Sequence, residues 1–469
     1  MEQIETIGAT EQRELTRIQI SVRNLVEFIF RSGDIDNRIG KGAQKEAMQE
    51  GSRMHRKIQG RMGMEYRAEV PLKLEVPQEQ YVLALEGRAD GIITNVDGVT
   101  VDEIKCMYTD VTRFEEPIFV HKAQAMCYAY IYALQNGLDQ ISVQLTYCDL
   151  DTEEICRFEE AFSFFWLERW FQDMMEAYRK WTDFQFAWRK IRQTSIQTLE
   201  FPFPYREGQY KLVGDVYRTI HRKKILFIQA PTGTGKTIST LFPAIRAVGE
   251  NLGDKIFYLT AKTITRTVAE DTIKLLKKQG LFLSAVTITA KEKICIQEEM
   301  QCNPESCERA KGHFDRINEA LYALLTAECE ISRENILLFA EKYKVCPYEL
   351  SFEAAVWADC IICDYNYVFD PHVNRKSLIE GSLQQNIYLI DEAHNLLDRA
   401  REMYSADIAK SDFKVPKKYF KDRNRFLFTI RRMTATAPCA ECIQMQYASG
   451  QCIRNSSAAN SLNRSQRRQ

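Results

Sequence analysis

The sequence lacks three features that would each assign the chain to a broad class. It contains no run of about 18 apolar residues, so no transmembrane helix is expected. It has no excess of either charge, because 63 Lys and Arg residues stand against 64 Asp and Glu residues. Bulk charge therefore does not indicate a nucleic-acid partner, which would need a local basic groove. The first residues, MEQIETIGATEQRE, are acidic and polar, which argues against a secretory signal peptide and predicts a cytoplasmic protein without membrane contact.

The composition that is present predicts a folded chain with several domains. Hydrophobic residues make up 45% of the 469 residues and aromatic residues 11%, which suffices for sizeable cores and excludes a disordered or fibrous chain. At roughly 150 residues per domain, this length suggests about three domains. The 14 cysteines, without a signal peptide, indicate reduced thiols and not a disulfide framework.

Hydrophobic patterning predicts two α/β regions. In the first, apolar residues occupy alternate positions over 66–76, the pattern of a strand. Further strands are expected at 81–87, 88–95, 99–107 and 140–148, a helix at 121–136, and an aromatic-rich helical stretch at 159–190. In the second region, short apolar runs predict buried parallel strands. These runs are 224–230, 255–261, 284–290, 359–363 and 387–391, with a charged, helical, Cys-containing insertion after the third.

The stretch APTGTGKT follows the first of these apolar runs and has the composition of a phosphate-binding loop. Its members are Ala230, Pro231, Thr232, Gly233, Thr234, Gly235, Lys236 and Thr237. The two glycines let backbone N–H groups turn inward around phosphates, Lys236 would contact the β- and γ-phosphates, and Thr237 would bind Mg²⁺. The motif predicts binding of ATP with Mg²⁺, although Ala230 replaces the usual first glycine.

The last apolar run ends in two carboxylates, Asp391 and Glu392, followed by His394. Asp391 would hold Mg²⁺ through water, and Glu392 would polarise the attacking water. Acidic residues that stabilise a helix N-terminus are the alternative, but two motifs in this order, each after its own strand, favour a nucleotide site. The pair resembles superfamily 2 helicases of the DEAH-box type. This resemblance implies that Arg206 and Gln209 read the adenine and that His394 supports the catalytic pair.

Four cysteines stand in the insertion with the spacing Cys-x6-Cys-x4-Cys-x38-Cys: Cys295, Cys302, Cys307 and Cys346. Four thiolates suit a [4Fe–4S] cluster or a zinc ion, and buried inert cysteines are an equal alternative on spacing alone. An insertion that ends in Cys-Pro-Tyr between the two nucleotide motifs is similar to XPD/DinG-type helicases, over residues 200–430. The resemblance implies a RecA-like P-loop domain, a [4Fe–4S] cluster on these cysteines, and 5′→3′ movement on single-stranded DNA.

Carboxylates and a lysine also stand on a predicted hairpin of the first region. Asp90 and Glu103 would end adjacent strands, with Lys105 on the same face as Glu103. Two carboxylates can bind Mg²⁺ or Mn²⁺ and a lysine can orient the hydrolytic water, whereas an exposed hairpin with an ion pair is the alternative. With three further residues, the set resembles the RecB-family branch of PD-(D/E)xK nucleases over residues 20–150. Those residues are His55, as a metal ligand, and Gln124 and Tyr128, as supporting groups.

Composition and the two resemblances together predict three parts. Residues 1–195 would form an α/β restriction-endonuclease-like nuclease domain, and residues 196–430 a RecA-like domain with a helical iron–sulfur insertion at 291–355 and the start of a helical arch after residue 396. Residues 431–469 would be a disordered, low-complexity tail. A second RecA-like domain, the source of transition-state arginines in such motors, has no counterpart in the sequence. The chain is therefore expected to be truncated or to be half of a split motor.

These patterns predict an ATP-dependent DNA helicase joined to a metal-dependent DNA nuclease. The expected cofactors are ATP, Mg²⁺ or Mn²⁺, and a [4Fe–4S] cluster. The expected substrate is single-stranded DNA or DNA with a single-stranded tail, and the expected partner is a second motor half or a second copy of the chain. Two alternatives remain open: a nuclease with a regulatory ATP-binding domain, and a non-catalytic DNA-binding fragment.

Overall fold

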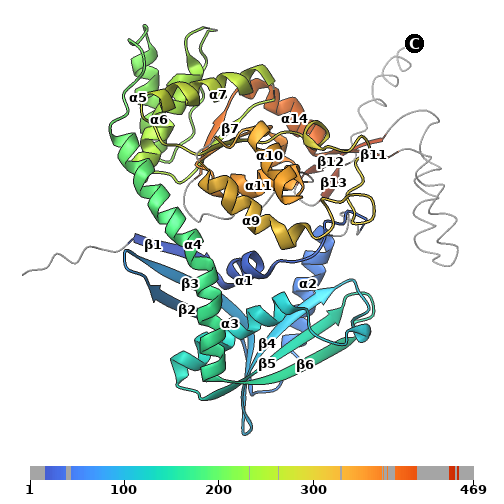
Figure 1. Ribbon diagram of the computed structural model, residues 1–469. Coiled ribbons are helices and arrows are strands. Elements are labelled where there is room, and N and C mark those ends of the chain that lie inside the picture. Colours follow the sequence, from blue (N-terminus) through green and yellow to red (C-terminus); the bar gives the residue numbers. More distant parts are fainter. Residues whose placement is uncertain are drawn as a thin grey trace, which may run out of the picture. The chain divides into compact units, whose positions relative to one another are not determined.

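The computed structural model divides into two compact units, which are described separately (Figure 1). Unit 1 comprises Met1–Thr198 and Thr289–Ala354, and unit 2 comprises Leu199–Ile288 and Ala355–Gln469. The residues whose structure is described are 16–38, 44–231, 233–261, 263–327, 330–371, 373, 378, 386–408, 443–448 and 451–453. Within these residues, no helix has the length and apolarity needed to cross a membrane.

Unit 1 is built on a six-stranded mixed sheet. The strands are β1 (Thr16–Ser21), β2 (Tyr66–Pro77), β3 (Tyr81–Asn95), β4 (Gly98–Met107), β5 (Gln140–Asp149) and β6 (Ile155–Ser163). They lie in the order β1-β3-β4-β5-β6, and β2 pairs with β3. β1–β3 and β4–β5 are parallel pairs, and the other neighbours are antiparallel. The two strands expected at 81–87 and 88–95 are one continuous strand, β3.

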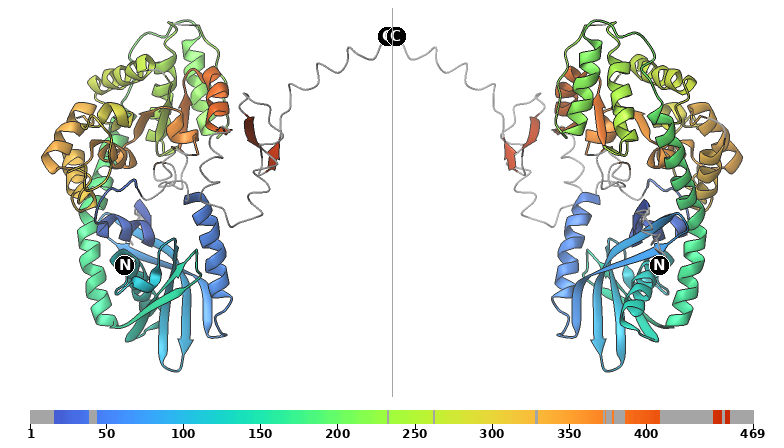
Figure 2. Two further views of the ribbon diagram at one scale, coloured as in Figure 1. Left: turned by 90° about the vertical axis from the view of Figure 1, so that its right-hand side faces the viewer. Right: turned by 90° about the vertical axis from the view of Figure 1, so that its left-hand side faces the viewer.

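Helices cover both faces of this sheet. They are α1 (Val22–Phe30), α2 (Gln44–Gln59), α3 (Phe119–Asn136) and α4 (Phe164–Gln197), with a 3-10 turn, η2, at Val111–Arg113. Met54 and Ile58 of α2 pack with Ile104 of β4, whereas α3 reaches the side chain of the next residue, Lys105. Because adjacent residues of a strand point to opposite faces, α2 and α3 cover different faces. Figure 2 shows the sheet between α2 and α4.

The aromatic-rich helix begins later than the sequence pattern predicts. Residues 155–163, partly assigned to a helix at 159–190, form the edge strand β6. The Ser163 hydroxyl then accepts a hydrogen bond from the N–H of Trp166 at 3.3 Å and caps α4. Most of β6 is exposed, so its sequence lacks the alternating apolar residues that reveal a half-buried strand.

The cysteine-containing insertion belongs to unit 1. Its helices are α8 (Lys291–Ile294), α9 (His313–Thr326), α10 (Arg333–Tyr343) and α11 (Pro347–Trp357). The segment after α1 runs along it in extended form: the N–H groups of Ile35 and Asn37 donate to the carbonyls of Ala310 and Cys302, both at 2.9 Å. In the sequence, these residues lie between strands of unit 2. In the structure, Thr289–Ala354 group with unit 1.

Unit 2 contains a four-stranded parallel sheet. Its strands are β7 (Ile256–Leu259), β8 (Ala285–Thr287), β9 (Cys360–Cys363) and β10 (Ile387–Ile390), in the order β10-β7-β9-β8. Its helices are α5 (Gln209–His221), α6 (Lys236–Gly249), α7 (Thr263–Lys278), α12 (Asn366–Phe369), η3 (Ala393–Asn395) and α14 (Leu396–Met403). A separate antiparallel sheet joins β11 (Ser405–Ile408), β12 (Ile443–Ala448) and β13 (Gln451–Ile453). The predicted α/β class with a parallel sheet is confirmed.

Two segments of unit 2 differ from expectation. Residues 224–230 do not form the predicted strand, and the side chains of Ile225 and Phe227 are 86% and 89% exposed. A strand requires a hydrogen-bonding neighbour, and no other described segment pairs with these residues. Conversely, β12 and β13 lie within 431–469, where disorder was expected; the rest of that tail is outside the described residues. Of the expected arch, α14 is helical, and residues 409–430 are likewise outside the described part.

Candidate metal and nucleotide sites

In unit 1, strand β4 and helix α3 bring four of the predicted nuclease residues into one chain of contacts. Lys105 Nζ lies 2.8 Å from Glu103 Oε1 and donates a hydrogen bond to Gln124 Oε1 at 3.0 Å. Gln124 Nε2 in turn donates to the Tyr128 hydroxyl at 3.5 Å. The i,i+4 spacing of the last two residues places both on one side of α3. The lysine therefore has a fixed position between a carboxylate and an amide.

Asp90 and His55 meet at the same place on the sheet. The N–H of Ile104 donates to Asp90 Oδ2 at 2.8 Å, and His55 Nε2 lies 2.7 Å from the Ile104 carbonyl oxygen and 3.8 Å from Asp90 Oδ2. The strand carrying Glu103 and Lys105 thus also fixes Asp90, and α2 supplies the histidine. All six residues that the RecB-type resemblance assigns to this site lie on contacting elements.

Burial makes the charged state of this site costly. It raises the pKa of Asp90 and of Glu103, and the neighbouring Lys105 only partly offsets that effect. Glu103 is 2% exposed, and its Oε2 has no hydrogen-bond partner among the described residues. A buried carboxylate oxygen without a donor is expensive, and a divalent cation would satisfy it. His55 and Asp90 belong to one group of closely spaced ligand atoms, of a kind that binds Mg²⁺ or Mn²⁺, whereas Glu103 does not belong to that group.

A glycine allows the close approach of α3 to the strand that carries Asp90. A Cβ atom on Gly87 would lie 2.5 Å from Cε1 and 2.8 Å from the hydroxyl oxygen of Tyr128. Any side chain at this position would therefore displace the Tyr128 ring from the sheet. The contact with Tyr128 therefore explains why a glycine stands in the sequence Glu-Gly-Arg-Ala-Asp, where no turn requires one.

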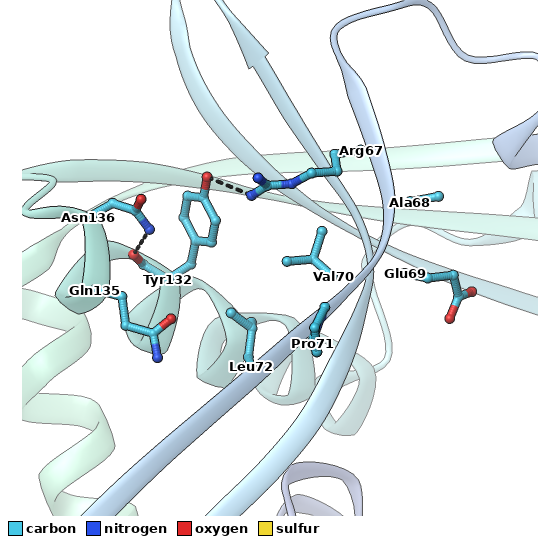
Figure 3. Close-up of a pocket in the computed structure, with 9 residues that line it drawn as sticks. All are labelled: Arg67, Ala68, Glu69, Val70, Pro71, Leu72, Tyr132, Gln135 and Asn136. Carbon is cyan, nitrogen blue, oxygen red and sulfur yellow. Dashed lines mark hydrogen bonds between the residues drawn. The ribbon is translucent and has the colours of Figure 1, made fainter.

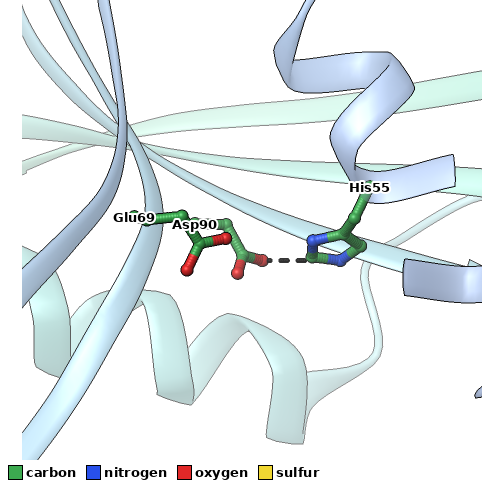
Figure 4. A group of neighbouring side chains, drawn as sticks. All are labelled: His55, Glu69 and Asp90. Atoms are coloured by element: carbon green, nitrogen blue, oxygen red, sulfur yellow. Dashed lines mark ion pairs between the residues drawn. The ribbon is translucent and has the colours of Figure 1, made fainter. Parts of the chain in front are cut away.

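Glu69 is a member of the site that the sequence reasoning missed. One ligand atom each from His55, Glu69 and Asp90 lie within 4.8 Å of one another (Figure 4). Glu69 stands on β2, and its side chain is 48% exposed. Nothing in the sequence distinguished it, because polar residues normally alternate with apolar ones along a half-buried strand.

A pocket of about 430 Å³ lies beside this group, between β2 and the end of α3 (Figure 3). Its lining residues are Arg67, Ala68, Glu69, Val70, Pro71, Leu72, Tyr132, Gln135 and Asn136. Arg67 donates to the Tyr132 hydroxyl at 3.1 Å and lies 5.8 Å from the centre of the Tyr132 ring. Of the residues in the carboxylate site, Glu69 alone among those described lines this pocket, and none of the sequence-predicted site residues does.

In unit 2, the phosphate-loop residues form a turn that starts α6 at Lys236. Gly233 and Gly235 adopt φ values of 79° and 76°, the left-handed conformation that glycine alone adopts without strain. Thr234 donates to the Pro231 carbonyl at 2.9 Å, and Lys236 Nζ donates to the Ala230 carbonyl at 3.2 Å. Thr232 lies outside the described residues.

The predicted adenine-reading residues contact this loop. Arg206 donates to the Gly233 carbonyl, and the buried amide of Gln209 donates to Ser239 Oγ at 3.1 Å and to the Thr234 carbonyl at 3.4 Å. Gln209 Oε1 also accepts the N–H of Arg206 at 3.1 Å. Both side chains are therefore tied to the loop backbone from the preceding segment.

Tyr258 of β7 lies near both halves of the predicted nucleotide site. Burial raises its pKa, and so does the charge of Asp391; the side chain of Thr237 lies near enough to the hydroxyl to lower this pKa in part. Thr237 and Asp391, the two predicted Mg²⁺ ligands, are therefore both close to this hydroxyl group. Nothing in the sequence indicates this position, because Tyr258 stands in an apolar run that predicts only a buried strand.

Glu392 has a strained backbone directly after β10. Its φ of 52° is unusual for a residue with a Cβ atom, and its Oε2 lies 3.4 Å from His394 Nδ1. The Tyr365 hydroxyl donates to the carbonyls of Asp391 and Glu392 and holds this turn. Strain of this kind persists only where surrounding contacts impose it, and it is common at functional sites.

The four predicted cluster cysteines lie in the insertion as free thiols. Lys291 lies near Cys302 and Cys346, and both cysteines raise its pKa. Burial raises the pKa of the Cys346 thiol to about 11, and the backbone N–H groups of Glu349 and Tyr348 offset this only in part. An ammonium group and N–H groups near a sulfur favour metal-bound thiolate, so the surroundings of Cys302 and Cys346 fit metal ligands.

The parallel sheet of unit 2 and the helices around it place this unit in the class of α/β domains. Residues 260–413 match the DEAD_2 family model. The matched residues include the four insertion cysteines and the Asp391–Glu392 pair, and they begin after the glycine loop.

Known proteins match only part of the chain. It is 23% identical over 270 residues to the Regulator of telomere elongation helicase 1 homolog of Anopheles gambiae, which covers 46% of this chain and 27% of that protein. It is 38% identical over 78 residues to the Fanconi anemia group J protein homolog of Gallus gallus, covering 17% and 6%. Among solved structures, XPD_Helicase is 18% identical and covers 51% of this chain and 42% of its own, with a TM-score of 0.33, too low to support a structural argument. The chain spans little more than a quarter of the Anopheles relative.

Proposed function

We propose that the chain is an ATP-dependent DNA helicase of the XPD/DinG class, which moves 5′→3′ on single-stranded DNA. The observation that carries the proposal is the left-handed glycine loop before α6, to whose carbonyls Arg206 and Gln209 donate hydrogen bonds. The match of residues 260–413 to DEAD_2 and the relatives named as helicases support the same class. A second motor half or a second copy of the chain is the proposed partner.

ATP and Mg²⁺ would be held by the loop of residues 230–237 and by Asp391. Lys236 would neutralise the β- and γ-phosphates, and Arg206 with Gln209 would contact the adenine. Glu392 would orient the attacking water and accept its proton, and His394 would hold the Glu392 carboxylate. Bound Mg²⁺ would supply charge stabilisation at the phosphates.

ATP hydrolysis with and without single-stranded DNA tests the motor proposal. We expect DNA to stimulate hydrolysis in the unaltered chain, and Lys236→Ala to lower the stimulated rate by about 100-fold. Lys224→Ala removes the same charge from an exposed position before the loop and serves as the matched control. Equal hydrolysis by the unaltered chain and Lys236→Ala would reject an autonomous motor.

The insertion is proposed to hold a [4Fe–4S] cluster on Cys295, Cys302, Cys307 and Cys346. Supporting this, the N–H groups of Tyr348 and Glu349 lie near Cys346, and the Lys291 side chain lies near Cys302. Iron, sulfide and zinc contents of anaerobically purified protein test the assignment. We expect Cys307→Ser to lower the iron content and Cys156→Ser, a half-exposed cysteine of β6, to leave it unchanged. A stoichiometric zinc content without iron would contradict the cluster.

A second activity, metal-dependent cleavage of DNA, is proposed for unit 1. The connected contacts from Glu103 through Lys105 to Gln124 favour it, together with the meeting of His55 and Asp90. These residues would hold Mg²⁺ or Mn²⁺, and Lys105 would orient the water that attacks the phosphodiester.

Paired variants separate this proposal from its alternatives. If Lys105→Ala abolishes cleavage while Lys236→Ala abolishes only ATP hydrolysis, both activities are present. Cleavage without any DNA-stimulated hydrolysis would favour a nuclease with a regulatory ATP-binding domain. Salt-sensitive binding of single-stranded DNA without either activity would favour a non-catalytic binding fragment, because phosphate contacts release counterions.

A further inference from the structure

We propose that Glu69 is a ligand of a divalent cation that it shares with Asp90 and His55. The inference rests on the nuclease function proposed above and extends its metal site beyond His55, Asp90 and Glu103. Glu69 would be the ligand nearest to solvent, and Glu103 the most buried one. The site would then take a cation of the Mg²⁺ or Mn²⁺ type, which prefers carboxylate oxygens.

The sheet register places the two carboxylates opposite each other. On either side of them, Ala68 pairs with Gly91 and Val70 pairs with Ala89. Glu69 therefore faces Asp90 across the antiparallel pair of β2 and β3, although the ladder itself is interrupted there. Like charges directly opposite each other destabilise a sheet, so this arrangement calls for a compensating positive charge.

The backbone of Glu69 is held in an unfavourable conformation at this point. Its φ is 56°, the left-handed region, within a strand whose other residues have negative φ. In Figure 3, the Glu69 side chain lies on the side of β2 away from Arg67 and Tyr132. Figure 4 shows the same side chain beside Asp90 and His55. The left-handed turn thus accompanies the placement of a carboxylate at the metal site.

The protein's own groups only partly compensate the charge of Glu69. Arg88 Nη1 lies 3.5 Å from Glu69 Oε2, but its side chain is 65% exposed and therefore well screened. Gln59 Nε2 donates to Glu69 Oε1 at 3.1 Å and to the Asp90 carbonyl at 3.0 Å. The amide fixes Glu69 over β3 without adding charge.

An independent observation on the buried side of the group also calls for a cation. Glu103 Oε2 is buried and has no partner among the described residues, and Asp90 and His55 are among its electrostatic neighbours. Asp90 thus lies between a buried unpaired carboxylate oxygen on β4 and an exposed carboxylate on β2. A cation bound at Asp90 would neutralise charge on both sides, with Glu69 completing the ligand set from β2.

Calorimetric titration with Mn²⁺, without nucleotide or DNA, tests the assignment. We expect Glu69→Gln to weaken Mn²⁺ binding by about tenfold or more, or to remove one bound ion. Glu79→Gln removes the same charge from the exposed turn between β2 and β3 and should bind Mn²⁺ as the unaltered chain does. Unchanged Mn²⁺ affinity and stoichiometry in Glu69→Gln would overturn the proposal.

Thermal unfolding provides a second readout that does not depend on activity. Without a cation, Glu69→Gln should unfold at a higher temperature than the unaltered chain, because it removes the repulsion from Asp90. With Mn²⁺, the unaltered chain should gain more in melting temperature than the variant. An equal Mn²⁺-induced gain in both proteins would count against Glu69 as a ligand.

The metal inference and the nuclease proposal can fail separately. Loss of Mn²⁺ binding in Glu69→Gln, with no DNA cleavage by the unaltered chain, would keep the ligand and reject the nuclease. Cleavage by the unaltered chain, with Mn²⁺ binding unchanged in Glu69→Gln, would keep the nuclease and reject the ligand.

Discussion

The carboxylate site of unit 1 and the nucleotide site of unit 2 are built in different ways. In unit 1, Asp90, Glu103 and Lys105 stand on adjacent strands whose register fixes their positions. In unit 2, the corresponding groups stand on two turns, one before α6 and one after β10, with left-handed residues at Gly233, Gly235 and Glu392. Regular strands hold side chains through many ladder bonds, whereas turns depend on a few contacts made by neighbouring side chains.

This difference indicates where each site is vulnerable. The unit 1 site depends on charge, because its carboxylates are buried and Lys105 is the cation that contacts Glu103 and Gln124. The unit 2 site depends on orientation, because the Tyr365 hydroxyl holds the turn that carries its acidic residues and the Tyr258 hydroxyl lies near Asp391. Substitutions that remove charge should therefore do most damage in unit 1, and those that remove a single hydroxyl should act in unit 2.

The largest effect is expected for Lys105→Ala. Loss of the lysine leaves Glu103 buried without its ion pair and leaves the attacking water without an orienting cation, so DNA cleavage should fall by about 10³-fold. Cleavage of a single-stranded oligonucleotide with Mn²⁺ measures this fall. Lys73→Ala removes an exposed lysine from β2 and should retain cleavage. If Lys105→Ala still cleaves DNA at the unaltered rate, Lys105 does not orient the attacking water, and the unit 1 site does not depend on this charge.

A smaller effect, confined to the other unit, is expected for Lys236→Ala. Loss of the ammonium group at the phosphates should slow ATP hydrolysis by about 100-fold. Binding of Mn²⁺ in unit 1 without nucleotide should not change, since the carboxylate ligands there are untouched. Parallel measurement of hydrolysis and Mn²⁺ titration checks both statements. A change in the Mn²⁺ titration would mean that the two sites are not independent.

The insertion contacts other residues of unit 1, so its contribution to the stability of that unit can be measured. Arg31 pairs with Glu353 at 2.7 Å and donates to Asn318 Oδ1 at 2.8 Å, and its side chain is 15% exposed. Arg31→Ala should therefore lower the free energy of unfolding of unit 1 by about 2–3 kcal/mol. Urea unfolding followed by tryptophan fluorescence measures this change, because four of the five tryptophans stand on α4.

A matched substitution on α1 controls for the loss of an arginine. Arg23 is 65% exposed and pairs with Glu27 one helical turn away, so Arg23→Ala should cost no more than about 0.5 kcal/mol. Equal midpoints for Arg23→Ala and Arg31→Ala would show that the contacts between the insertion and unit 1 contribute little stability.

The sequence predicted the parts of this molecule that depend on local pattern. The hairpin and its period of two placed Asp90, Glu103 and Lys105 on adjacent strands, as the structure has them. Glu69 was not predictable, because a glutamate on a strand is normally solvated and only the pairing with β3 brings it opposite Asp90. The strand positions of these residues were therefore predictable from the hairpin, and their role in a site stays a prediction.

Tertiary contacts account for the remaining differences. The apolar run 224–230 predicted a buried strand, but apolar residues report a preference for burial and not the presence of a partner strand. The grouping of Thr289–Ala354 with unit 1 was equally hidden, because its position in the sequence interrupts the strands of unit 2. Only contacts such as the bond between Asn37 and Cys302 reveal where the insertion packs.

The smallest effect is expected for Tyr258→Phe. The change removes one hydroxyl and no charge, and a polar contact of this kind contributes at most about 0.5–1.5 kcal/mol, so ATP affinity should fall by about two- to tenfold. The loss should appear when Mg²⁺ is present and disappear in EDTA, because the hydroxyl lies near Thr237 and Asp391, the two proposed Mg²⁺ ligands. Binding of a fluorescent ATP analogue under both conditions measures the difference.

A neighbouring tyrosine provides the control for Tyr258→Phe. Tyr388 stands on the adjacent strand β10, stacks on Phe257 with ring centres 5.2 Å apart and is 39% exposed. Tyr388→Phe makes the same chemical change without touching Thr237 or Asp391, so ATP affinity should be unaffected with or without Mg²⁺. Two results would show that the Tyr258 hydroxyl acts on the stability of the sheet. One is an equal loss of ATP affinity in both variants, and the other is a loss in Tyr258→Phe that is as large in EDTA as with Mg²⁺. The site in unit 2 would then depend on packing, as ordinary strands do, and not on the orientation of two ligands by one side chain.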